Sequence, residues 1–207
     1  DFYDFIKVSD HEFGIALGDV SGHGIEAGII MGMAKKALQI YAKGVSSPKQ
    51  ALSITNADLS LDLADSTFVS AAYGVLDIHQ KVFRFARAGN NPPYLVNAAR
   101  NPVVSEIKPN GMVLGVDKSG KRFPLVTQEL TIQLLSGDIF FQYTDGLVEA
   151  PNRDKQEFGE ERLKELLRKY AATPLLELME LIEAEFRVHI GALEQEDDLT
   201  MVAFRVI

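Results

Sequence analysis

The sequence predicts an α+β fold in which two antiparallel sheets are flanked by helices. Segments typical of strands and of helices alternate in blocks along the 207 residues. Most connections between successive strand segments are too short for a crossover helix, so neighbouring strands are expected to pair antiparallel. The composition is 46% hydrophobic and 24% charged, which is typical of one ordinary globular domain.

The first elements predicted are a hairpin and two helices. The segments Phe2–Val8 and Phe13–Gly18 alternate around a polar turn, which indicates two paired strands. Apolar residues then recur with helical spacing over Ile25–Lys43. Ser47 followed by Pro48 is typical of a helix start, and that second helix is expected to reach about residue 65.

Strand segments dominate the middle of the chain. β-Branched and aromatic residues separated by Gly, Pro and Asn predict strands at Thr67–Ile78, Val82–Ala88, Tyr94–Val96, Val103–Ile107, Phe123–Leu135 and Asp138–Thr144. Helical spacing returns over Glu160–Ala171 and Pro174–Ile190, and a last strand is expected at Leu199–Val206.

Composition excludes several classes of function. The chain has no cysteine, which rules out disulfide scaffolds, thiolate zinc sites and cysteine nucleophiles and is compatible with the cytoplasm, where we expect the protein. With 21 basic and 29 acidic residues, the formal net charge of −8 opposes binding to nucleic acid. No apolar run approaches the ~18 residues of a membrane span.

Three aspartates share one context, because Asp19 and Asp145 each follow a predicted strand and Asp197 precedes one. Carboxylates with carbonyls and water suit Mg²⁺ or Mn²⁺, whereas the four histidines have no spacing that would favour zinc. These residues could also have purely structural roles. Each aspartate can form a turn or cap a helix, the glycines of Gly18–Gly24 can be a simple connection, and Asp197 with Asp198 can be a solvated acidic turn.

Six motifs in order resemble those of the SpoIIE/RsbU-type serine phosphatases. This family is the bacterial regulatory branch of the metal-dependent protein phosphatases, the protein phosphatase 2C superfamily. The motifs are Asp1–Phe5, Gly18–Gly24, Phe68–Asp77, Ala88–Tyr94, Tyr143–Ala150 and Asp197–Thr200. The resemblance implies a four-layer α/β/β/α sandwich with two divalent cations, Mn²⁺ or Mg²⁺, where the edges of the two sheets meet.

The resemblance also assigns roles to residues. Asp19 matches the carboxylate that bridges both metals, and the carbonyl of Val20 matches the backbone ligand beside it. Asp145 and Asp197 match the remaining carboxylate ligands.

Two assignments have close alternatives. Asp1 matches the acidic residue that holds metal-bound water, although Asp4 lies near it in the sequence. Asp198 aligns with an Asn of the wider superfamily, and for that reason Asp197 is the preferred ligand.

The activity implied is hydrolysis of phosphoserine or phosphothreonine by a metal-bridging hydroxide. The implied substrate is a phosphorylated anti-anti-sigma protein of the STAS type. We expect residues 1–207 to be one such domain at the C-terminal end of a longer regulatory protein, with an upstream sensor or receiver domain and a homodimer formed through that region. The alternatives are a catalytically weak partner-binding module and a phosphatase for small phosphoesters.

The chain departs from the family pattern at several positions. Asn90 stands where relatives usually carry His, and Ser70 stands where Thr is common, so we expect altered loop packing or substrate contact there. His23 cannot take the leaving-group acid role by alignment, and it has the alternative of anchoring its loop through a hydrogen bond. Gly28 and Gly32 share one face of a predicted helix, which indicates either tight packing or a helix whose position is regulated.

Overall fold

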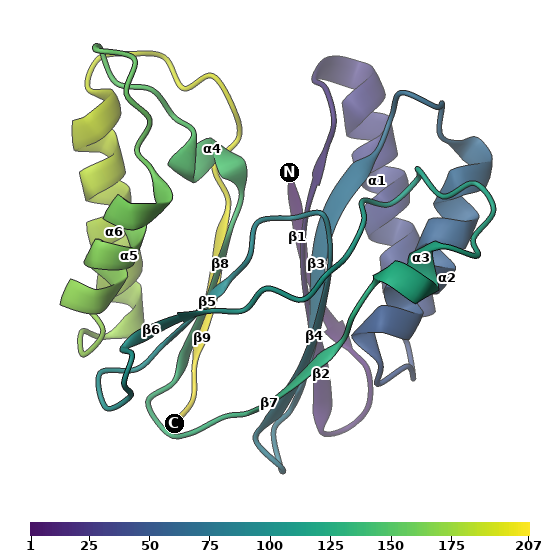
Figure 1. Cartoon of the computed structure of the whole chain (residues 1–207), viewed down its shortest axis with the longest axis horizontal. Coiled ribbons are helices and arrows are strands. Elements are labelled where there is room, and N and C mark those ends of the chain that lie inside the picture. Colours follow the sequence, from purple (N-terminus) through teal and green to yellow (C-terminus); the bar gives the residue numbers. More distant parts are fainter. The chain divides into compact units, whose positions relative to one another are not determined.

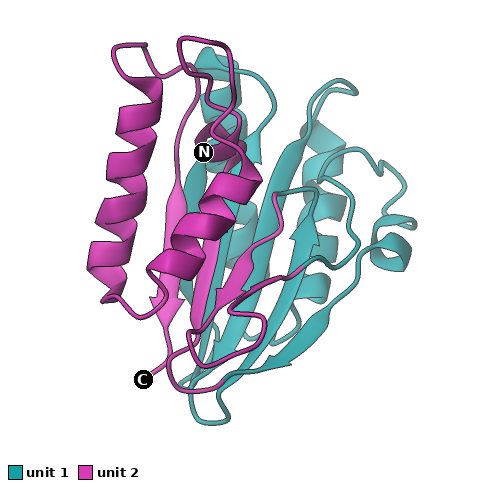
Figure 2. Cartoon of the chain, turned by 60° about the vertical axis from the view of Figure 1, so that its left-hand side comes forward, with its two compact units in different colours: residues 1–90, 108–134 teal, residues 91–107, 135–207 magenta.

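Nine strands and six helices form two antiparallel sheets in the computed structural model, which describes residues 1–207 (Figure 1). The first sheet has the strand order β1-β2-β3-β4-β7 and the second has the order β6-β5-β8-β9. The chain divides into two compact units, residues 1–90 with 108–134 and residues 91–107 with 135–207 (Figure 2). The predicted α+β class with antiparallel sheets is confirmed.

The bounds of the elements agree with most of the predicted segments. The strands are β1 Phe2–Lys7, β2 Glu12–Val20, β3 Val69–Asp77, β4 Val82–Ala88, β5 Tyr94–Val96, β6 Val104–Glu106, β7 Leu130–Gln133, β8 Ile139–Tyr143 and β9 Met201–Arg205. The helices are α1 Gly24–Tyr41, α2 Pro48–Asp62, α3 Phe123–Val126, α4 Asp145–Val148, α5 Glu160–Lys169 and α6 Leu175–Ile190. None of the helices combines the length and the apolar character needed to cross a membrane.

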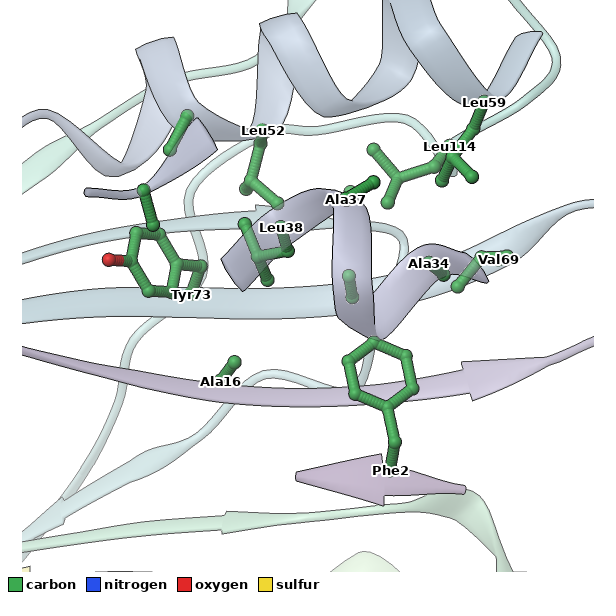
Figure 3. Close-up of a cluster of buried hydrophobic side chains, with 14 of the residues drawn as sticks. Phe2, Ala16, Ala34, Ala37, Leu38, Leu52, Leu59, Val69, Tyr73 and Leu114 are labelled. Carbon is green, nitrogen blue, oxygen red and sulfur yellow. The ribbon is translucent and has the colours of Figure 1, made fainter. Parts of the chain in front are cut away.

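Unit 1 packs α1 and α2 against one face of the first sheet. Alternate strand residues such as Val69 and Tyr73 point to this face, because side chains along a strand alternate between its two sides. They meet Leu38 of α1 and Leu52 of α2 in a cluster of buried apolar side chains (Figure 3). Burying each such side chain contributes about 1.5–3 kcal/mol to folding, so this cluster fixes the sheet on which Asp19 lies.

Unit 2 packs α5 and α6 against the second sheet. Phe141 and Tyr143 of β8 are fully buried with Leu163 and Leu167 of α5 and with Ile182 of α6. The rings of Tyr143 and Tyr94 stack with centroids 5.7 Å apart, and their hydroxyl oxygens lie 3.3 Å apart. Burial raises the pKa of both hydroxyls. This apolar cluster holds β8, whose end leads directly into Asp145.

The predicted strand Phe123–Leu135 is wrong over its first part, which forms the short helix α3. The side chain of Asp117 explains this, since its Oδ2 accepts hydrogen bonds of 2.7 Å from the backbone N–H groups of Arg122 and Phe123. Pro124 at the start of the helix has no N–H group to satisfy. The apolar pattern of the segment did not reveal this contact with Asp117, five residues before Arg122.

The tight-packing interpretation of Gly28 and Gly32 is also wrong. Both residues are exposed on α1, and a Cβ atom built at either position would meet nothing within 4 Å. The same face carries Ile25 and Ile29, which are 86% and 61% exposed. The glycines therefore do not allow another backbone to approach closely within the structure.

Asp138 forms a buried ionic cluster in unit 2. Its side chain is 0% exposed, and its carboxylate accepts hydrogen bonds from the Arg100 guanidinium, from Asn97 Nδ2 at 2.8 Å and from the N–H of Leu135 at 2.7 Å. Burial alone would raise the pKa of Asp138, but these hydrogen bonds outweigh it and hold the pKa below its usual value.

We expect Asp138→Asn to lower the free energy of unfolding by about 3 kcal/mol at pH 7, because it leaves Arg100 without its partner charge. Since the folded pKa of Asp138 is lowered, its stabilisation is present above pH ~4 and is lost as the pH falls through the folded value. Urea titrations at several pH values should therefore show the difference from the unmodified chain shrinking below pH ~4. A difference that is the same at every pH would contradict this account, and the exposed Asp154→Asn is the control.

Candidate metal centre

Asp19 lies inside strand β2, two residues before the chain leaves the sheet. We predicted that the strand ends at Gly18, but β2 continues through Val20, with Asp19 opposite Ser70 and Val20 opposite Val69 of β3. The pairing continues because the N–H of Ser21 donates to the carbonyl of Phe68 at 3.1 Å, and the N–H of Phe68 donates to Ser21 Oγ at 3.0 Å. The pairing with β3 therefore fixes the backbone of Asp19 in the sheet.

The register of β1 separates Asp1 from Asp4. Phe2 lies opposite Gly18, so the next position of the same register places Asp1 opposite Asp19. A side chain at Gly18 would collide with the ring of Phe2, with a closest distance of 2.4 Å, and glycine thus permits this pairing. Residues directly opposite each other share a face of the sheet. Asp1 accordingly lies on the face of Asp19.

Asp4 lies elsewhere on the strand. It is opposite Ala16, and it shares the other face of the sheet with Phe2 and Ile6, which belong to the core under α1. Its Oδ1 accepts a hydrogen bond from the N–H of Phe5 at 2.9 Å. The placement favours Asp1 over Asp4 as the acidic residue that supports Asp19.

The two positions that depart from the family pattern contact each other. Asn90 is 3% exposed, and its Nδ2 donates to Ser70 Oγ at 3.0 Å. The Arg87 guanidinium donates to the carbonyl of Asn90 at 2.7 Å. Because Ser70 lies directly opposite Asp19, Asn90 holds the neighbour of the predicted bridging ligand. Asn90 thus takes part in the packing of its loop, and a buried Asn90 is poorly placed to contact a substrate.

Asn90→Ala is expected to lower the free energy of unfolding by about 1 kcal/mol, the typical contribution of one such hydrogen bond. We also expect the variant to bind Mn²⁺ several-fold more weakly, because Ser70 loses the contact that fixes it beside Asp19. A calorimetric titration with Mn²⁺ measures this shift. The exposed Asn110→Ala is the matched control, and equal Mn²⁺ affinities for the two variants would contradict a positioning role for Asn90.

The alternative role for His23, anchoring its loop through a hydrogen bond, is not observed. His23 is exposed and precedes α1 without capping the helix through its side chain. With Ser21, Glu26 and Thr67, it lines a polar pocket of about 320 Å³ in unit 1. This pocket adjoins the loop that follows Asp19, and it offers hydroxyl and imidazole groups to a bound polar ligand.

Asp145 and Asp197 lie in neighbouring loops of unit 2. Asp145 begins helix α4, and its Oδ1 accepts a hydrogen bond from the N–H of Gly146 at 3.0 Å. Thr144 connects the two loops, because its N–H donates to the carbonyl of Thr200 and its Oγ1 accepts from the N–H of Thr200. These bonds place the loop that precedes β9 beside the end of β8.

Gly146 makes this close approach possible. A Cβ atom at Gly146 would lie 2.0 Å from the carbonyl oxygen of Asp198, so any other residue would push the two loops apart. Asp197 Oδ1 in turn accepts from the N–H of Asp198 at 2.8 Å, and Gln195 donates to the carbonyl of Asp197 at 2.7 Å. The strand-end context that we predicted for Asp145 and Asp197 thus corresponds to a structured pair of loops.

Sequence reasoning missed Glu149, which belongs to the same acidic region. Its pKa is raised by desolvation of the carboxyl group and then by the negative charges of Asp145, Glu157 and Asp197. Glu149 directly follows the one-turn helix α4, and its sequence motif gave no sign that it interacts with Asp197. The carboxylates of Asp145, Glu157 and Asp197 near Glu149 place several negative charges together, which a divalent cation would neutralise.

The donor atoms therefore fit a hard divalent cation. Unit 1 brings Asp1 and Asp19 to one face of a sheet beside the carbonyl of Val20, and unit 2 brings Asp145 and Asp197 into adjacent loops. All of these groups offer oxygen, as Mg²⁺ and Mn²⁺ prefer. No group of three or more acidic or histidine side chains in the structure is arranged to hold a metal ion, so the complete ligand set remains a prediction.

Comparison with known proteins adds an independent line of argument. The sequence profile of the family described as Stage II sporulation protein E (SpoIIE) matches residues 9–207. The chain is 26% identical to phosphoserine phosphatase RsbU of Bacillus subtilis over 99% of the chain and 58% of RsbU. It is 25% identical to protein IcfG of Synechocystis over 98% of the chain and 35% of IcfG. The chain thus spans less than two thirds of the length of each of these relatives.

A solved structure confirms the fold class. The SiaA-PP2C domain of Pseudomonas aeruginosa superposes with a TM-score of 0.85 and 25% sequence identity. The match covers 100% of the chain and 80% of the SiaA domain. The predicted class of two antiparallel sheets with helices is thus shared with a solved PP2C domain.

Proposed function

The chain belongs to the SpoIIE family, and from this membership we propose that it is a metal-dependent protein phosphatase that hydrolyses phosphoserine or phosphothreonine. The observation that carries the proposal is the match of the family profile to residues 9–207, together with the presence of Asp19, Asp145 and Asp197. A relative of the same family is a phosphoserine phosphatase, RsbU, and its similarity extends over almost the whole chain.

Two divalent cations, Mn²⁺ or Mg²⁺, are the proposed cofactors. Asp19 and the Val20 carbonyl in unit 1, with Asp145 and Asp197 in unit 2, would hold them, and Asp1 would hold an ordered water beside Asp19. Such cations lower the pKa of water and neutralise the negative charge of a phosphoryl group. The all-oxygen donor set and the excess negative charge around Glu149 support this assignment.

The residues of the chain would have two roles in such a reaction. They position the carboxylate ligands, and the negative charge of these ligands makes phosphate binding depend on the cations. The sheet fixes Asp19 through its pairing with Ser70, and Asn90 fixes Ser70. Gly146 keeps the loop of Asp145 against the loop of Asp197. Without cations these carboxylates would repel a phosphate dianion, so we propose that metal is required for substrate binding as well as for the rate.

We propose a phosphorylated anti-anti-sigma protein of the STAS type as the substrate. The motifs contain no Arg or Lys that could grip a free phosphate, which makes recognition through a protein surface the more consistent arrangement. A sensor or receiver domain in the same protein, and a dimer formed through it, are proposed as the means of regulation. The lengths of RsbU and IcfG beyond the matched part are compatible with such additional domains.

The activity is tested by phosphate release from a phosphoserine peptide with 1–207 in the presence and absence of Mn²⁺. We expect release that depends on Mn²⁺ or Mg²⁺ and that stops when the metal is chelated. Turnover that is equal in chelator would contradict the proposal. Binding of a phosphoprotein without hydrolysis, at saturating Mn²⁺, would instead favour the catalytically weak module.

A further inference from the structure

Strand β9 forms an edge of the second sheet. It has few of the features that normally keep an edge strand from pairing with a strand of another molecule. It pairs only with β8, at the end of the strand order β6-β5-β8-β9 (Figure 1). Edges are usually protected by short length, charged residues, Pro or bulges. Strands β6 and β7 are three and four residues long, and β1 carries Asp4 and Lys7. β9 has five residues with neither Lys nor Pro, and the guanidinium of its one charged residue, Arg205, donates to the carbonyls of Ala171 and Thr173.

The register shows which backbone groups of β9 point away from β8. Thr200 and Val206 exchange backbone hydrogen bonds with the β8 side, through Thr144, Asp138 and Gly137. Residues of an antiparallel pair alternate between bonded and non-bonded positions. The N–H and C=O groups of Met201, Ala203 and Arg205 therefore face outward, where a further strand could bind them.

A pocket lies beside this edge on the side of α6. It has a volume of about 530 Å³ and is lined entirely by unit 2, which Figure 2 shows in magenta. Leu176 and Met179 of α6 line it together with Met201 of β9, and Leu176 is 73% exposed. Methionine side chains adapt to different apolar partners. The pocket thus offers an apolar surface next to the outward backbone groups.

The charge of this surface defines its partner. Glu180 and Glu183 line the pocket with one cation, Arg187, which pairs with Glu183 at 2.6 Å. Gln195 lines it from the following loop, between Glu194 and Glu196. Arg205 does not line the pocket, and its guanidinium donates to the carbonyls of Ala171 and Thr173. The surface is therefore apolar at its base and acidic around it.

We propose that β9 and the α6 pocket form a docking site for an extended partner segment in which apolar and basic residues take turns at every second position, so that both lie on the face toward α6. The segment adds to β9 as a fifth strand through the outward groups of Met201, Ala203 and Arg205. On that face its apolar side chains enter the pocket against Leu176, Met179 and Met201, and its basic side chains reach Glu180 and Glu183. A second copy of the chain is a poor occupant, because pairing β9 with β9 brings two acidic α6 surfaces together.

The test uses 1–207 and a fluorescein-labelled octapeptide with valine and lysine in turn at the odd positions and threonine at the even positions, with fluorescence anisotropy as the measurement. We expect this lysine–valine peptide to bind at least ~10-fold more tightly than the matched octapeptide with glutamate in place of lysine. Ala203→Pro removes one outward N–H and is expected to weaken binding ~10-fold, since Pro is tolerated where an edge N–H faces solvent. Glu180→Lys is expected to weaken it by a similar factor.

Glu177→Lys is the matched control, because Glu177 is exposed on the same helix but does not line the pocket. We expect it to change the affinity less than ~2-fold, as a surface charge outside the site should. Hydrogen exchange should show the amides of Met201, Ala203 and Arg205 becoming protected when the lysine–valine peptide is added. If Ala203→Pro does not fold, the proposal is tested by the affinity of Glu180→Lys and by the hydrogen-exchange measurement.

Three outcomes would overturn the proposal. The first is equal affinity for the basic and the acidic peptide. The second is an affinity that Glu180→Lys and Glu177→Lys reduce to the same extent, which would indicate attraction to the net negative charge alone. The third is a dimer in sedimentation that is lost in a folded Ala203→Pro, because the edge would then pair with a second copy. None of these measurements depends on phosphatase activity, so this proposal and the proposed function can fail separately.

Discussion

Asp19→Asn is expected to lower kcat on a phosphoserine peptide by at least ~1,000-fold at ordinary Mn²⁺ concentrations, which corresponds to about 4 kcal/mol of transition-state stabilisation. The reason is that one substitution removes negative charge from both proposed cations. Asp145→Asn removes a ligand of one cation and is also expected to abolish measurable turnover. The measurement is phosphate release at several Mn²⁺ concentrations, with folding confirmed by circular dichroism.

Asp4→Asn is the matched control for Asp19→Asn. Both are aspartates of the first sheet, but Asp4 lies on the opposite face, beside the core under α1. We expect Asp4→Asn to change kcat by less than ~3-fold, since a residue away from the reacting groups should not affect the transition state. If Asp19→Asn retains comparable turnover, or if Asp4→Asn is the more damaging change, the assignment of the metal ligands is wrong.

The second large effect concerns the substrate. kcat/KM on a cognate phosphorylated protein is expected to exceed that on a short phosphopeptide by at least ~100-fold, which corresponds to ~2.7 kcal/mol of remote binding energy. The physical reason is the absence of Arg and Lys from the metal motifs, which leaves affinity to be supplied by a protein surface. Comparing initial rates on both substrates at matched Mn²⁺ measures the ratio. Equal values would indicate a generalist phosphatase without a dedicated partner.

Periodicity predicted the long elements of the fold because a buried face repeats a local pattern. The helix from Pro48 begins where Ser47 accepts the hydrogen bond from the N–H of Gln50, and strand β4 has the predicted bounds. Helix α3 could not be predicted in this way. Its N-terminal N–H groups bind Asp117, and nothing in a pattern of apolar residues reports that contact.

The same holds for the predicted site residues. A motif shows which residues stand next to each other in the sequence, but it does not show which segments contact each other in the fold. Motifs placed Asp145 and Asp197 next to strands, and the structure has them in adjacent loops because Gly146 admits the carbonyl of Asp198. The hydrogen bond between Asn90 and Ser70 required the register of β3, which no single motif contains. Gly28 and Gly32 show the opposite error, since a shared helix face did not reveal whether that face is buried or exposed.

Anomalous diffraction from crystals of 1–207 grown with Mn²⁺ tests the central claim most directly. The account predicts two Mn²⁺ peaks about 3.5–4 Å apart, with Asp19 as a ligand of both and with Asp145 and Asp197 bound to the second. The same data would show whether Asp1 holds water beside Asp19. A single Mn²⁺ bound elsewhere, or two that do not involve Asp19, would contradict the account.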